Sequence, residues 1–586
     1  MTNREIAAVF DHVADLLEFK GANPFRVRAY RNGARKVGDY PEPLAVVSED
    51  PNRQLTDIDG IGKDLAEKIE HLLTFSRLPM LEELQAEIPA GVMALLRVPG
   101  LGPKKAAALH KELQIDSLDR LQAACEAGEV QKLKGFGKKT EETILKGIEL
   151  AAKADERTRW ADADAIVADL KSHLAGVPGV RQLEAAGSYR RGKETVGDLD
   201  FLVDADEAAP IMDRLGEYPG VAETIVRGDT KMSVRLDTGM QVDLRVVPAR
   251  SFGAALQYFT GSKEHNVEVR GRAKARGLRV NEWGVFRVDK DKAENGEDGG
   301  PLAGEYVAGE SEADVYAALD LPCFPPELRE ARQEFRWAEQ GELPRLIELA
   351  DLRGDLHMHT TATDGKATLD EMIAAARQRG YEYIAITDHS QRVSMARGLD
   401  PERLRRQWAE IDRVNKQLDD LVVLKGIECD ILERGGMDLP DDVLAEADWV
   451  VASVHYGQQQ SREQITDRIL GALEHPCVNV IAHPTGRLIN RREAYAVDVE
   501  AMIAAAAEHG KLLEINANPM RLDLDDVHAA AAQRRGVPIV INSDAHSTAG
   551  LDVLRYGVLQ ARRAGLTAAD VANTRPWAEF KELLGR

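Results

Sequence analysis

From about Asp351 to the C-terminus, short apolar runs of strand length alternate with segments of helical period. Each run ends in metal-binding residue types, in the segments Asp355–His359, Ile384–His389, Val422–Glu428, Val450–His455, Val480–His483 and Ile539–His546. Strands that alternate with helices predict a parallel β/α series. The carboxyl ends of such strands meet at one end of a barrel, so these polar residues are expected to lie close together.

The pattern before this barrel predicts several further parts. Helical periods dominate the first 150 residues, and strands then alternate with helices from about Trp160 to Pro248. The charge- and Gly-rich run Asp289–Gly300 is interpreted as an exposed hairpin, and a Pro-rich stretch with a charged helix over Glu327–Gly341 as a linker. The predicted domains are two helical domains over 1–95 and 96–158, two middle domains over 159–250 and 251–323, a linker over 324–350 and the barrel over 351–586.

A weak internal repeat marks the helical part. Three Gly-x-Gly turns, each followed by lysine, precede helical segments, at Gly60, Gly62, Gly100, Gly102, Lys104, Gly135, Gly137 and Lys138. Glycine lets backbone amides approach a phosphate with no Cβ in the way, and the lysines add charge. The repeat resembles helix-hairpin-helix elements, which implies sequence-independent DNA binding. Ordinary turns are the alternative interpretation.

Composition limits the class of protein. The chain of 586 residues is too long for one core. Its four cysteines show no paired spacing, its N-terminus has no signal peptide and no segment resembles a membrane span, so we expect a soluble cytoplasmic protein, a monomer. The net charge of −22 means that any contact with DNA is local, and Lys263–Arg287 is a basic segment suited to it.

The segment Gly187–Asp200 carries the clearest chemistry. Strand alternation places Asp198 and Asp200 on one face, and Asp243 on a neighbouring strand would complete a cage for two hard cations. Two such ions can activate a 3′-hydroxyl and stabilise a leaving pyrophosphate. The backbone at Gly187 and Ser188, with Arg191, would then hold a triphosphate. A solvated strand edge is the alternative for a bare Asp-x-Asp.

These residues resemble the palm of a family X DNA polymerase, the family of DNA polymerase beta. The resemblance implies that Asp198, Asp200 and Asp243 bind two Mg²⁺ or Mn²⁺ ions. It also implies an α/β nucleotidyltransferase palm over 159–250, in which the Gly197 backbone joins Ser188 and Arg191 around the triphosphate.

The resemblance continues into a thumb over 251–323. Tyr258, Phe259 and Gly261 match the family's aromatic-Gly turn under the nucleotide sugar, and Asn266 and Arg270 match residues that face the minor groove of the nascent pair. Two residues depart from the pattern. Gln241 stands where the beta enzyme has an arginine and Lys263 where it has an acid, which bears on metal and base contacts.

The barrel resembles the polymerase-and-histidinol-phosphatase (PHP) domain. Six of the fourteen histidines lie at the strand ends. All nine ligand positions expected for such a domain carry residues that can bind a metal: His357, His359, Asp364, His389, Glu428, His455, His483, Asp544 and His546. The resemblance implies three metals. The first is held by His357, His359, Glu428 and Asp544, the second by Glu428, His455 and His483, and the third by Asp364, His389 and His546. Mixed imidazole and carboxylate ligands favour Mn²⁺, Zn²⁺ or Fe²⁺ over Mg²⁺ alone.

One stretch of the first helical domain resembles a lyase site. The segments Gly60–Gly62 and Ala66–Ile69 resemble the lyase region of the beta enzyme and place Lys68 at its Schiff-base position. A lysine attacks an aldehyde only as the neutral amine, whereas Asp64 and Glu67 favour the protonated form. Lyase activity is therefore expected to be weak or absent.

Together these features predict a multidomain repair enzyme with helical N-terminal domains, an α/β palm, a thumb and a distorted β/α barrel. It would fill short gaps in primed DNA from dNTPs and remove 3′-terminal nucleotides in the barrel. For the barrel, a phosphatase, an abasic-site endonuclease or a pyrophosphatase is the alternative. A small-molecule nucleotidyltransferase and an inactive DNA-bound scaffold are the rival classes for the whole chain.

Overall fold

A computed structural model describes residues 3–288 and 304–584, except 39, 41–43, 51–52, 59, 76–77, 88–94, 96–97, 99–100, 102, 134, 139, 142 and 146–156. The predicted hairpin at Asp289–Gly300 therefore lies outside the described residues. The chain divides into two compact units, Met1–Arg157 and Thr158–Arg586. Within the described residues, no helix is both long and apolar enough to cross a membrane.

The first unit is helical, as the periodicity predicts. Its elements are α1 (Asn3–Phe19), α2 (Pro24–Gly38), α3 (Leu44–Glu49), η1 (Leu55–Asp57), α4 (Lys63–Phe75), α5 (Pro79–Glu87), α7 (Pro103–Leu113), α8 (Leu118–Glu126) and η2 (Val130–Lys132). One apolar cluster joins them, from Ile6 in α1 to Ile144. The apolar stripe of each helix is therefore covered by the others.

The three glycine turns share one backbone pattern. In each, the amide of the residue between the glycines donates to a carbonyl three residues earlier: Ile61 to Ile58 at 2.9 Å, Leu101 to Val98 at 2.9 Å and Phe136 to Leu133 at 3.0 Å. The first glycine has a φ of +86° at Gly60 and +91° at Gly135. L side chains rarely adopt this conformation, which explains the glycine.

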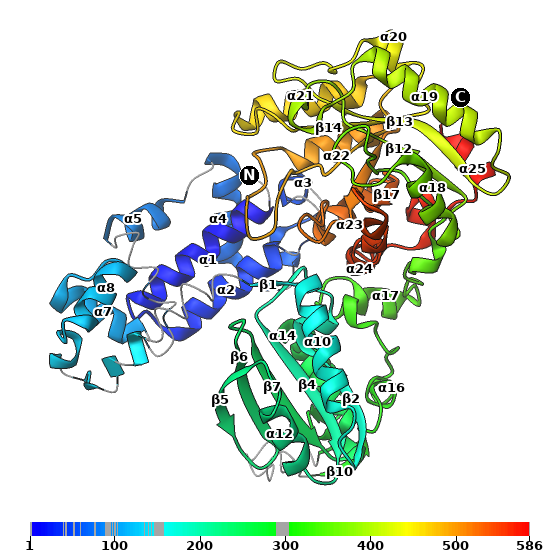
Figure 1. The fold of residues 1–586 in the computed structure, drawn as a ribbon. Coiled ribbons are helices and arrows are strands. Elements are labelled where there is room, and N and C mark those ends of the chain that lie inside the picture. Colours follow the sequence, from blue (N-terminus) through cyan, green and yellow to red (C-terminus); the bar gives the residue numbers. More distant parts are fainter. Residues whose placement is uncertain are drawn as a thin grey trace. The chain divides into compact units, whose positions relative to one another are not determined.

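The palm begins the second unit. Its elements are β1 (Thr158–Arg159), α10 (Trp160–Leu174), β2 (Val180–Ala185), α11 (Gly187–Arg190), β3 (Thr195–Val196), β4 (Asp198–Ala205), α12 (Ala209–Gly216), β5 (Val221–Arg227), β6 (Lys231–Leu236) and β7 (Gln241–Val247). The main sheet, teal to green in Figure 1, has the order β2-β4-β7-β6-β5. Its central strands β4 and β7 are parallel, and their neighbours are antiparallel.

The thumb follows, with α13 (Ala249–Thr260), α14 (Lys263–Ala275), β8 (Leu278–Asn281), β9 (Gly284–Arg287), β10 (Glu305–Ala308) and α16 (Glu312–Ala317). The next segment differs from the predicted linker. It forms η3 (Pro326–Leu328) and a shorter helix, α17 (Glu334–Gln340), and it is packed into the thumb core. Phe324 is fully buried, and buried Glu334 accepts a hydrogen bond from His265 at 2.9 Å. The charged residues of this segment suggested that it is exposed to solvent. Several of them, however, are buried with partners that lie far away in the sequence.

The barrel contains seven parallel strands in chain order. They are β11 (Gly354–Asp355), β12 (Tyr383–Ile386), β13 (Val422–Asp430), β14 (Trp449–Ser453), β15 (Val480–Ile481), β16 (Leu512–Asn516) and β17 (Ile539–Asn542). A bridge between Met358 and Ala545 joins the two edges beyond β11 and β17, which closes the ring.

Helices separate the barrel strands, as the sequence predicts. They are η4 (Leu349–Asp351), α18 (Leu369–Gln378), η5 (Ser394–Ala396), α19 (Pro401–Asn415), α20 (Asp441–Leu444), α21 (Arg462–Glu474), α22 (Val499–Glu508), α23 (Asp526–Arg534), η6 (Thr548–Val553), α24 (Leu554–Arg563), η7 (Ala568–Asp570), η8 (Ala572–Thr574) and α25 (Trp577–Leu583). Figure 1 shows them around the strands, in green through yellow to red. Burial of almost every strand residue agrees with a parallel sheet covered on both faces.

Buried ion pairs join palm, thumb and barrel inside the second unit. Arg487 of the barrel pairs with Glu194 of the palm at 2.6 Å, and Arg563 of α24 bonds both to Glu330 at 3.1 Å and to the carbonyl of Arg191 at 2.7 Å. The side chains of Arg487 and Arg563 are 8% and 2% exposed. Breaking such a pair leaves an uncompensated buried charge, so these contacts hold the three parts in one geometry.

A second ion pair fastens the thumb to the palm and supplies a pH test. Glu312 accepts bonds from Arg190 at 2.8 Å and from Arg329. Burial alone would raise the pKa of Glu312, but hydrogen bonds and charge from the two arginines lower it from 4.5 to about 2. A carboxyl group whose pKa is lower in the folded than in the unfolded protein stabilises the fold at pH values above its unfolded pKa. This contribution disappears as the pH falls through the pKa of the folded state.

We therefore expect Glu312→Gln to lower unfolding free energy by roughly 3 kcal/mol near pH 7, with the difference from the parent protein shrinking from about pH 4.5 towards pH 2. Urea unfolding of the parent, Glu312→Gln and the exposed control Glu310→Gln across that range measures it. A difference that stays constant with pH would contradict the assignment.

Candidate metal centres

The palm brings the three predicted aspartates together. In the parallel pairing of β4 with β7, Asp200 faces Asp243 directly, and Asp198 lies two residues along the same face. Gly187 lies against this group, since a Cβ added there would meet Asp200 Oδ2 at 2.5 Å. The carboxylates therefore form one cluster beside the start of the predicted triphosphate loop.

The carboxylates of this cluster repel one another, and a bound cation would relieve the repulsion. Burial, and then the charges of Asp198 and Asp243, raise the pKa of Asp200 to about 7. Asp243 behaves differently. Burial opposes ionisation there too, but bonds from Ser233 and Gln241 and the charge of Lys231 lower its pKa. Gln241 donates to Asp243 at 3.0 Å, so the residue that departs from the family pattern orients the third carboxylate.

The predicted triphosphate loop runs from Gly187 to Gly197. Ser188 is half-buried and Gly197 is exposed. Arg191 donates to Glu330 at 3.0 Å and to the carbonyl of Thr260 at 2.8 Å. These bonds use two of the five N–H donors of a guanidinium, so a triphosphate would share Arg191 with the thumb.

The aromatic turn of the thumb, Tyr258–Gly261, is held by hydrogen bonds from a buried side chain. Asn266 is 8% exposed, and its Nδ2 donates to the carbonyls of Tyr258 at 2.6 Å and Gly261 at 3.2 Å, while its Oδ1 accepts from Gln257 at 2.9 Å. The Arg245 guanidinium lies 4.6 Å from the centre of the Phe259 ring. Here Asn266 fixes the turn, a role that the family resemblance did not suggest. Arg270 is exposed.

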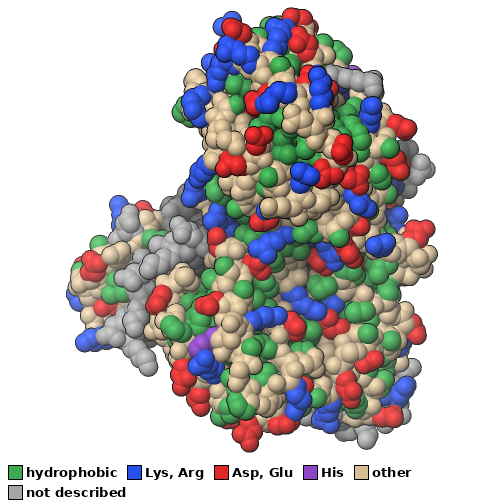
Figure 2. Space-filling model, turned by 45° about the vertical axis from the view of Figure 1, so that its right-hand side comes forward, with side chains coloured by type: hydrophobic (Ala, Val, Ile, Leu, Met, Phe, Trp, Pro, Cys, Tyr) green, Lys and Arg blue, Asp and Glu red, His purple; other side chains and the backbone are tan. Residues whose placement is uncertain are grey.

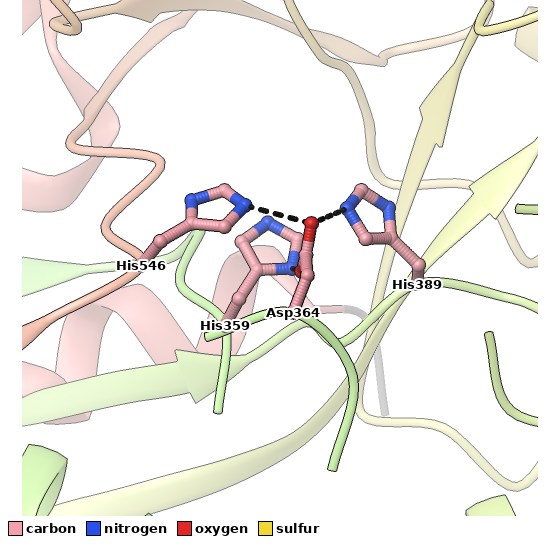
Figure 3. Close-up of side chains that lie close together, drawn as sticks. All are labelled: His359, Asp364, His389 and His546. Carbon is pink, nitrogen blue, oxygen red and sulfur yellow. Dashed lines mark ion pairs between the residues drawn. The ribbon is translucent and has the colours of Figure 1, made fainter. Parts of the chain in front are cut away.

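The first barrel cluster gathers His359, Asp364, His389 and His546, with possible ligand atoms within 4.8 Å of one another. His389 Nε2 and His546 Nε2 each lie 3.4 Å from Asp364 Oδ2. Figure 3 shows the two imidazoles pointing at that carboxylate from either side. This includes the three ligands implied for the third metal, with His359 added.

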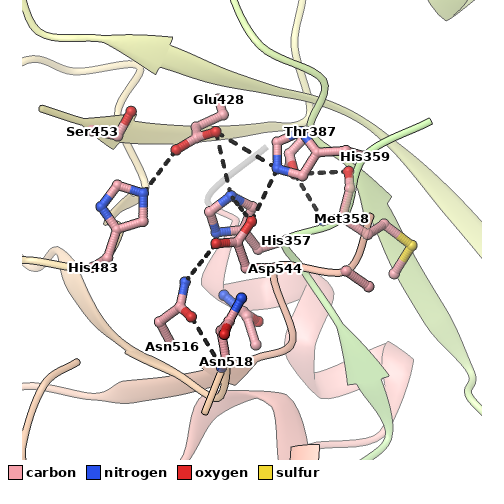
Figure 4. Close-up of polar contacts among 12 residues, drawn as sticks. His357, Met358, His359, Thr387, Glu428, Ser453, His483, Asn516, Asn518 and Asp544 are labelled. Carbon is pink, nitrogen blue, oxygen red and sulfur yellow. Dashed lines mark hydrogen bonds and ion pairs between the residues drawn. The ribbon is translucent and has the colours of Figure 1, made fainter. Parts of the chain in front are cut away.

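The second barrel cluster is built around Glu428, at the end of β13. Its Oε2 lies 3.6 Å from Nε2 of both His357 and His359, and its Oε1 lies 3.0 Å from His483 Nε2 and 3.4 Å from His455 Nε2. Figure 4 shows Glu428 with His483 on one side and His357 and His359 on the other. The geometry suits a carboxylate that bridges two cations.

Asp544 completes this cluster. Its Oδ1 lies 3.2 Å from His359 Nε2 and 3.7 Å from His357 Nε2. Asp544 and His483 also have positive φ angles, 53° and 31°. L residues rarely adopt this backbone conformation, and the free energy that it costs is often found at functional sites.

The donor set fits divalent metals. Within the described residues, the Nε2 atoms of His357 and His359 are buried and make no hydrogen bond. Burial without a partner is costly, and a cation among these atoms would satisfy them. The pKa values of the imidazoles also shift in opposite directions. Burial and neighbouring imidazoles lower the pKa of His359 to about 4, whereas Glu428 and Asp364 outweigh burial and raise the pKa of His389 to about 10.

Several supporting residues were not predicted from the sequence. Glu514 in β16 is fully buried, lies 2.7 Å from His357 Nδ1 and accepts a hydrogen bond from the amide of His483 at 2.7 Å. Buried Asp430 lies 3.3 Å from His455 Nδ1. A carboxylate behind a histidine ligand fixes its orientation and tautomer. The apolar run Leu512–Asn516 ends in polar residues like the other six, which was an available signal.

The helical unit contains the remaining predicted residues. Gly60, Gly62, Gly135, Gly137 and exposed Lys138 are described, whereas Gly100 and Gly102 lie outside the described residues, as does the side chain of Lys104. Lys68 Nζ lies 2.5 Å from Asp64 Oδ1. This contact does not test lyase activity, and weak or absent activity stays the prediction.

The fold and the two sites define a class of protein in which a nucleotidyltransferase palm and thumb precede a metal-binding β/α barrel. Four family models agree with this organisation: a helix-hairpin-helix domain over residues 1–78, a SAM-like helix-hairpin-helix tandem over 92–149, the DNA polymerase beta thumb over 255–330 and a PHP domain over 355–518. The palm lies between the second and third of these matches.

Among the relatives, a Bacillus subtilis protein named DNA polymerase/3'-5' exonuclease PolX is 40% identical over 588 residues and covers all of both chains. The chain belongs to this PolX family of family X DNA polymerases. Its barrel alone resembles proteins named probable phosphatase. One from a Thermoanaerobacter species is 29% identical over 233 residues, 38% of this chain and 89% of the relative, and one from Acetivibrio thermocellus is 30% identical over 201 residues, 33% and 78%.

Proposed function

We propose that the protein is a DNA polymerase that fills short gaps in damaged DNA and that its barrel removes 3′-terminal nucleotides. The domain limits proposed for it are those expected from the sequence, except that the segment expected to be a linker is packed into the thumb core. The observation that carries the proposal is the register that sets Asp200 opposite Asp243, in a chain whose barrel brings together nine further candidate ligands. Gapped DNA and dNTPs are the proposed substrates, and a monomer is the proposed working form.

In the palm, Asp198, Asp200 and Asp243 would hold two Mg²⁺ or Mn²⁺ ions. Such ions lower the pKa of a 3′-hydroxyl and stabilise the pyrophosphate that leaves. The protein's own residues supply position. Ser188, Arg191 and the Gly197 backbone would orient the triphosphate, and the Tyr258–Gly261 turn would shape the space for the sugar.

In the barrel, the nine ligands would hold up to three ions, with Mn²⁺, Zn²⁺ or Fe²⁺ favoured by the mixed donors. Bound metals of this kind make hydroxide available near neutral pH. Glu428 would take part in holding two of the ions, and Glu514 would keep the His357 ring oriented for binding. The phosphatase relatives make removal of a 3′-phosphate the second candidate for the barrel.

A primer with a 5′ label, annealed beside a gap, tests both activities together. With dNTPs we expect extension to the end of the gap, and without dNTPs we expect stepwise shortening from the 3′ end. Reactions in Mg²⁺ and then in Mn²⁺ compare the metals. A second primer ending in a 3′-phosphate distinguishes a phosphatase, which would remove the phosphate and leave the nucleotides.

Tyr258 supplies a test of the sugar pocket. We expect Tyr258→Ala to reduce discrimination against ribonucleotides by roughly tenfold, because removing side-chain bulk makes room for a 2′-hydroxyl. The carbonyl of Tyr258 is held by Asn266, so the substitution removes the ring and leaves the turn anchored. The ratio of kcat/KM for a dNTP to that for the matching rNTP measures it, and Tyr258→Phe is the control that keeps the ring. Unchanged selectivity with normal dNTP use would exclude Tyr258 as the barrier.

A further inference from the structure

One helix of the barrel, α24, packs against the palm along a single face. The ring of Tyr556 meets the ring of Trp160 in α10 edge-on, with 5.7 Å between their centroids. Leu559 lies against the loop that follows α11, since a Cβ added at Gly192 would meet its Cδ1 at 2.5 Å. Arg563 follows one turn later on the same side, as residues spaced by three, four and seven do in a helix. The predicted triphosphate loop of the palm therefore rests on a barrel helix.

Arg563 contacts this loop in two ways. Its Nη1 donates to the carbonyl of Arg191 at 2.7 Å and to Glu330 Oε1 at 3.1 Å. The same carboxylate oxygen accepts from Arg191 Nε at 3.0 Å and lies 3.4 Å from Lys193 Nζ. Two cations of the palm and one of the barrel thus share one oxygen. Arg191 is connected to Arg563 through its main chain directly and through its side chain by way of Glu330.

These contacts differ from the charges on the surface because they are buried. Figure 2 shows acidic and basic side chains interspersed over one face of the molecule. Exposed pairs of that kind contribute little to stability. The side chains of Glu330 and Arg563, in contrast, are 6% and 2% exposed. A buried polar network whose members are paired holds those members rigidly.

The network sets the orientation of Arg191, the residue expected to bind the triphosphate. Its guanidinium donates to Glu330 and to the carbonyl of Thr260, and two bonds fix the plane of this rigid fork of donors. Glu330 is held in turn by Arg563, whose Nη2 lies 2.7 Å from Asp526 of α23. A guanidinium binds phosphate through two parallel bonds only when its plane is correctly oriented. The barrel therefore controls a geometry that matters in the palm.

We propose that Arg563 is a positioning residue for nucleotide incorporation, which acts from the barrel by holding Glu330 and the Arg191 backbone and so directs Arg191 at the triphosphate. This inference rests on the proposed polymerase function and adds a barrel residue to the palm site. The barrel then supports the palm in addition to carrying its own candidate metal ligands.

A double-mutant cycle in the full chain tests this role. KM and kcat for incorporation of one nucleotide into a gapped primer are measured for the parent, Arg563→Met, Arg191→Met and the double variant. We expect Arg563→Met to raise KM for the dNTP roughly tenfold and to change kcat by no more than about twofold, because it weakens a contact made before and during the reaction. In the Arg191→Met background the same substitution should raise KM by less than about twofold, because its effect runs through Arg191.

Arg562→Met is the matched control. Arg562 is the neighbouring arginine of α24, and it pairs with Glu327 at 2.7 Å and not with the loop. Its replacement should leave KM at the parent value. Inhibition of incorporation gives a second measurement. Inhibition by inorganic tripolyphosphate should weaken in Arg563→Met by the same factor as dNTP binding, whereas inhibition by a deoxyribonucleoside, which carries no phosphate, should stay unchanged.

A second variant keeps the test decisive if Arg563→Met does not fold. Leu559→Ala leaves the ion pairs in place and removes only the apolar support under Gly192, so KM should rise by roughly threefold, and an unchanged KM would count against the role. Equal effects of Arg563→Met in the two backgrounds, or an equal rise of KM in Arg562→Met, would overturn it. A parent protein that incorporates no nucleotide would overturn the proposed polymerase as well, which separates the two failures.

Discussion

Replacing Asp198 and Asp200 with alanine is expected to reduce primer extension by roughly 10³-fold or more while nuclease activity in the barrel persists. The two carboxylates form one side of the palm cluster, opposite Asp243. Without them the chain would have two fewer charged oxygen ligands for the proposed ions, which would activate the primer and neutralise the triphosphate. The measurement is single-nucleotide incorporation into a gapped primer under saturating dNTP.

Loss of folding would not explain this result. Burial and mutual repulsion raise the pKa of Asp200 to about 7, so removing these carboxylates relieves repulsion in the metal-free palm. We expect unchanged or higher thermal stability of the variant. Asp206→Asn, at the end of the same segment with a side chain 81% exposed, is the matched control and should extend primers normally. Loss of both activities in a folded double variant would show that the centres are not separate.

Replacing Glu428 is expected to have the converse effect, a loss of nucleotide removal of roughly 10³-fold with extension retained. Glu428 lies at the centre of the barrel ligands, within 3.6 Å of ring nitrogens of His357, His359, His455 and His483. Its removal would affect two of the implied metals together. Release of 3′-nucleotides from single-stranded DNA in Mn²⁺ measures the effect.

The choice of substitution matters at this position. Imidazole charges outweigh burial and lower the pKa of Glu428 well below its usual range, so an alanine would remove the buried carboxylate that those imidazoles share. Glu428→Gln keeps the shape and removes only the charge, and it should lose the same activity. Glu446→Gln, which alters an exposed carboxylate paired with Arg405, is the control. A Glu428→Gln protein that still shortened DNA at the parent rate would place the chemistry elsewhere.

Local pattern predicted both centres. Strand parity placed Asp198 and Asp200 on one face, and the βα alternation placed the barrel ligands at one set of strand ends, because both inferences need only the period of a strand and the direction of parallel chains. The pairing with Asp243 required a guess about the neighbouring strand, which the register of β4 and β7 confirms.

Contacts between residues that lie far apart in the sequence could not be predicted from the pattern. Glu330 and Phe324 look like parts of a polar, Pro-rich linker, yet they are buried against Arg563 and the thumb core. Arg191 and Asn266 matched residues of a family, but their bonds to Glu330 and to the Tyr258 carbonyl depend on how α13, α14 and the following segment pack. A period of two or 3.6 residues carries no information about such partners.

One buried residue of the second unit, Arg487, connects the palm to the edge of the barrel site. Arg487 donates to the carbonyls of Arg521 and Leu522 in the loop after β16 and also pairs with Glu194 in the loop of the palm. The predicted triphosphate loop and the edge of the candidate barrel site therefore share one anchor. The two candidate centres lie in one folded unit.

The central claim is that one chain carries two independent metal centres, one that adds nucleotides and one that removes them. The most direct test uses a single 5′-labelled gapped primer with the parent protein, Asp198→Ala/Asp200→Ala and Glu428→Gln, each with and without dNTPs in Mn²⁺. We predict that the parent both extends and shortens the primer, that the palm variant only shortens it and that the barrel variant only extends it. A variant of either centre that lost both reactions while folded, or retained both, would contradict the account.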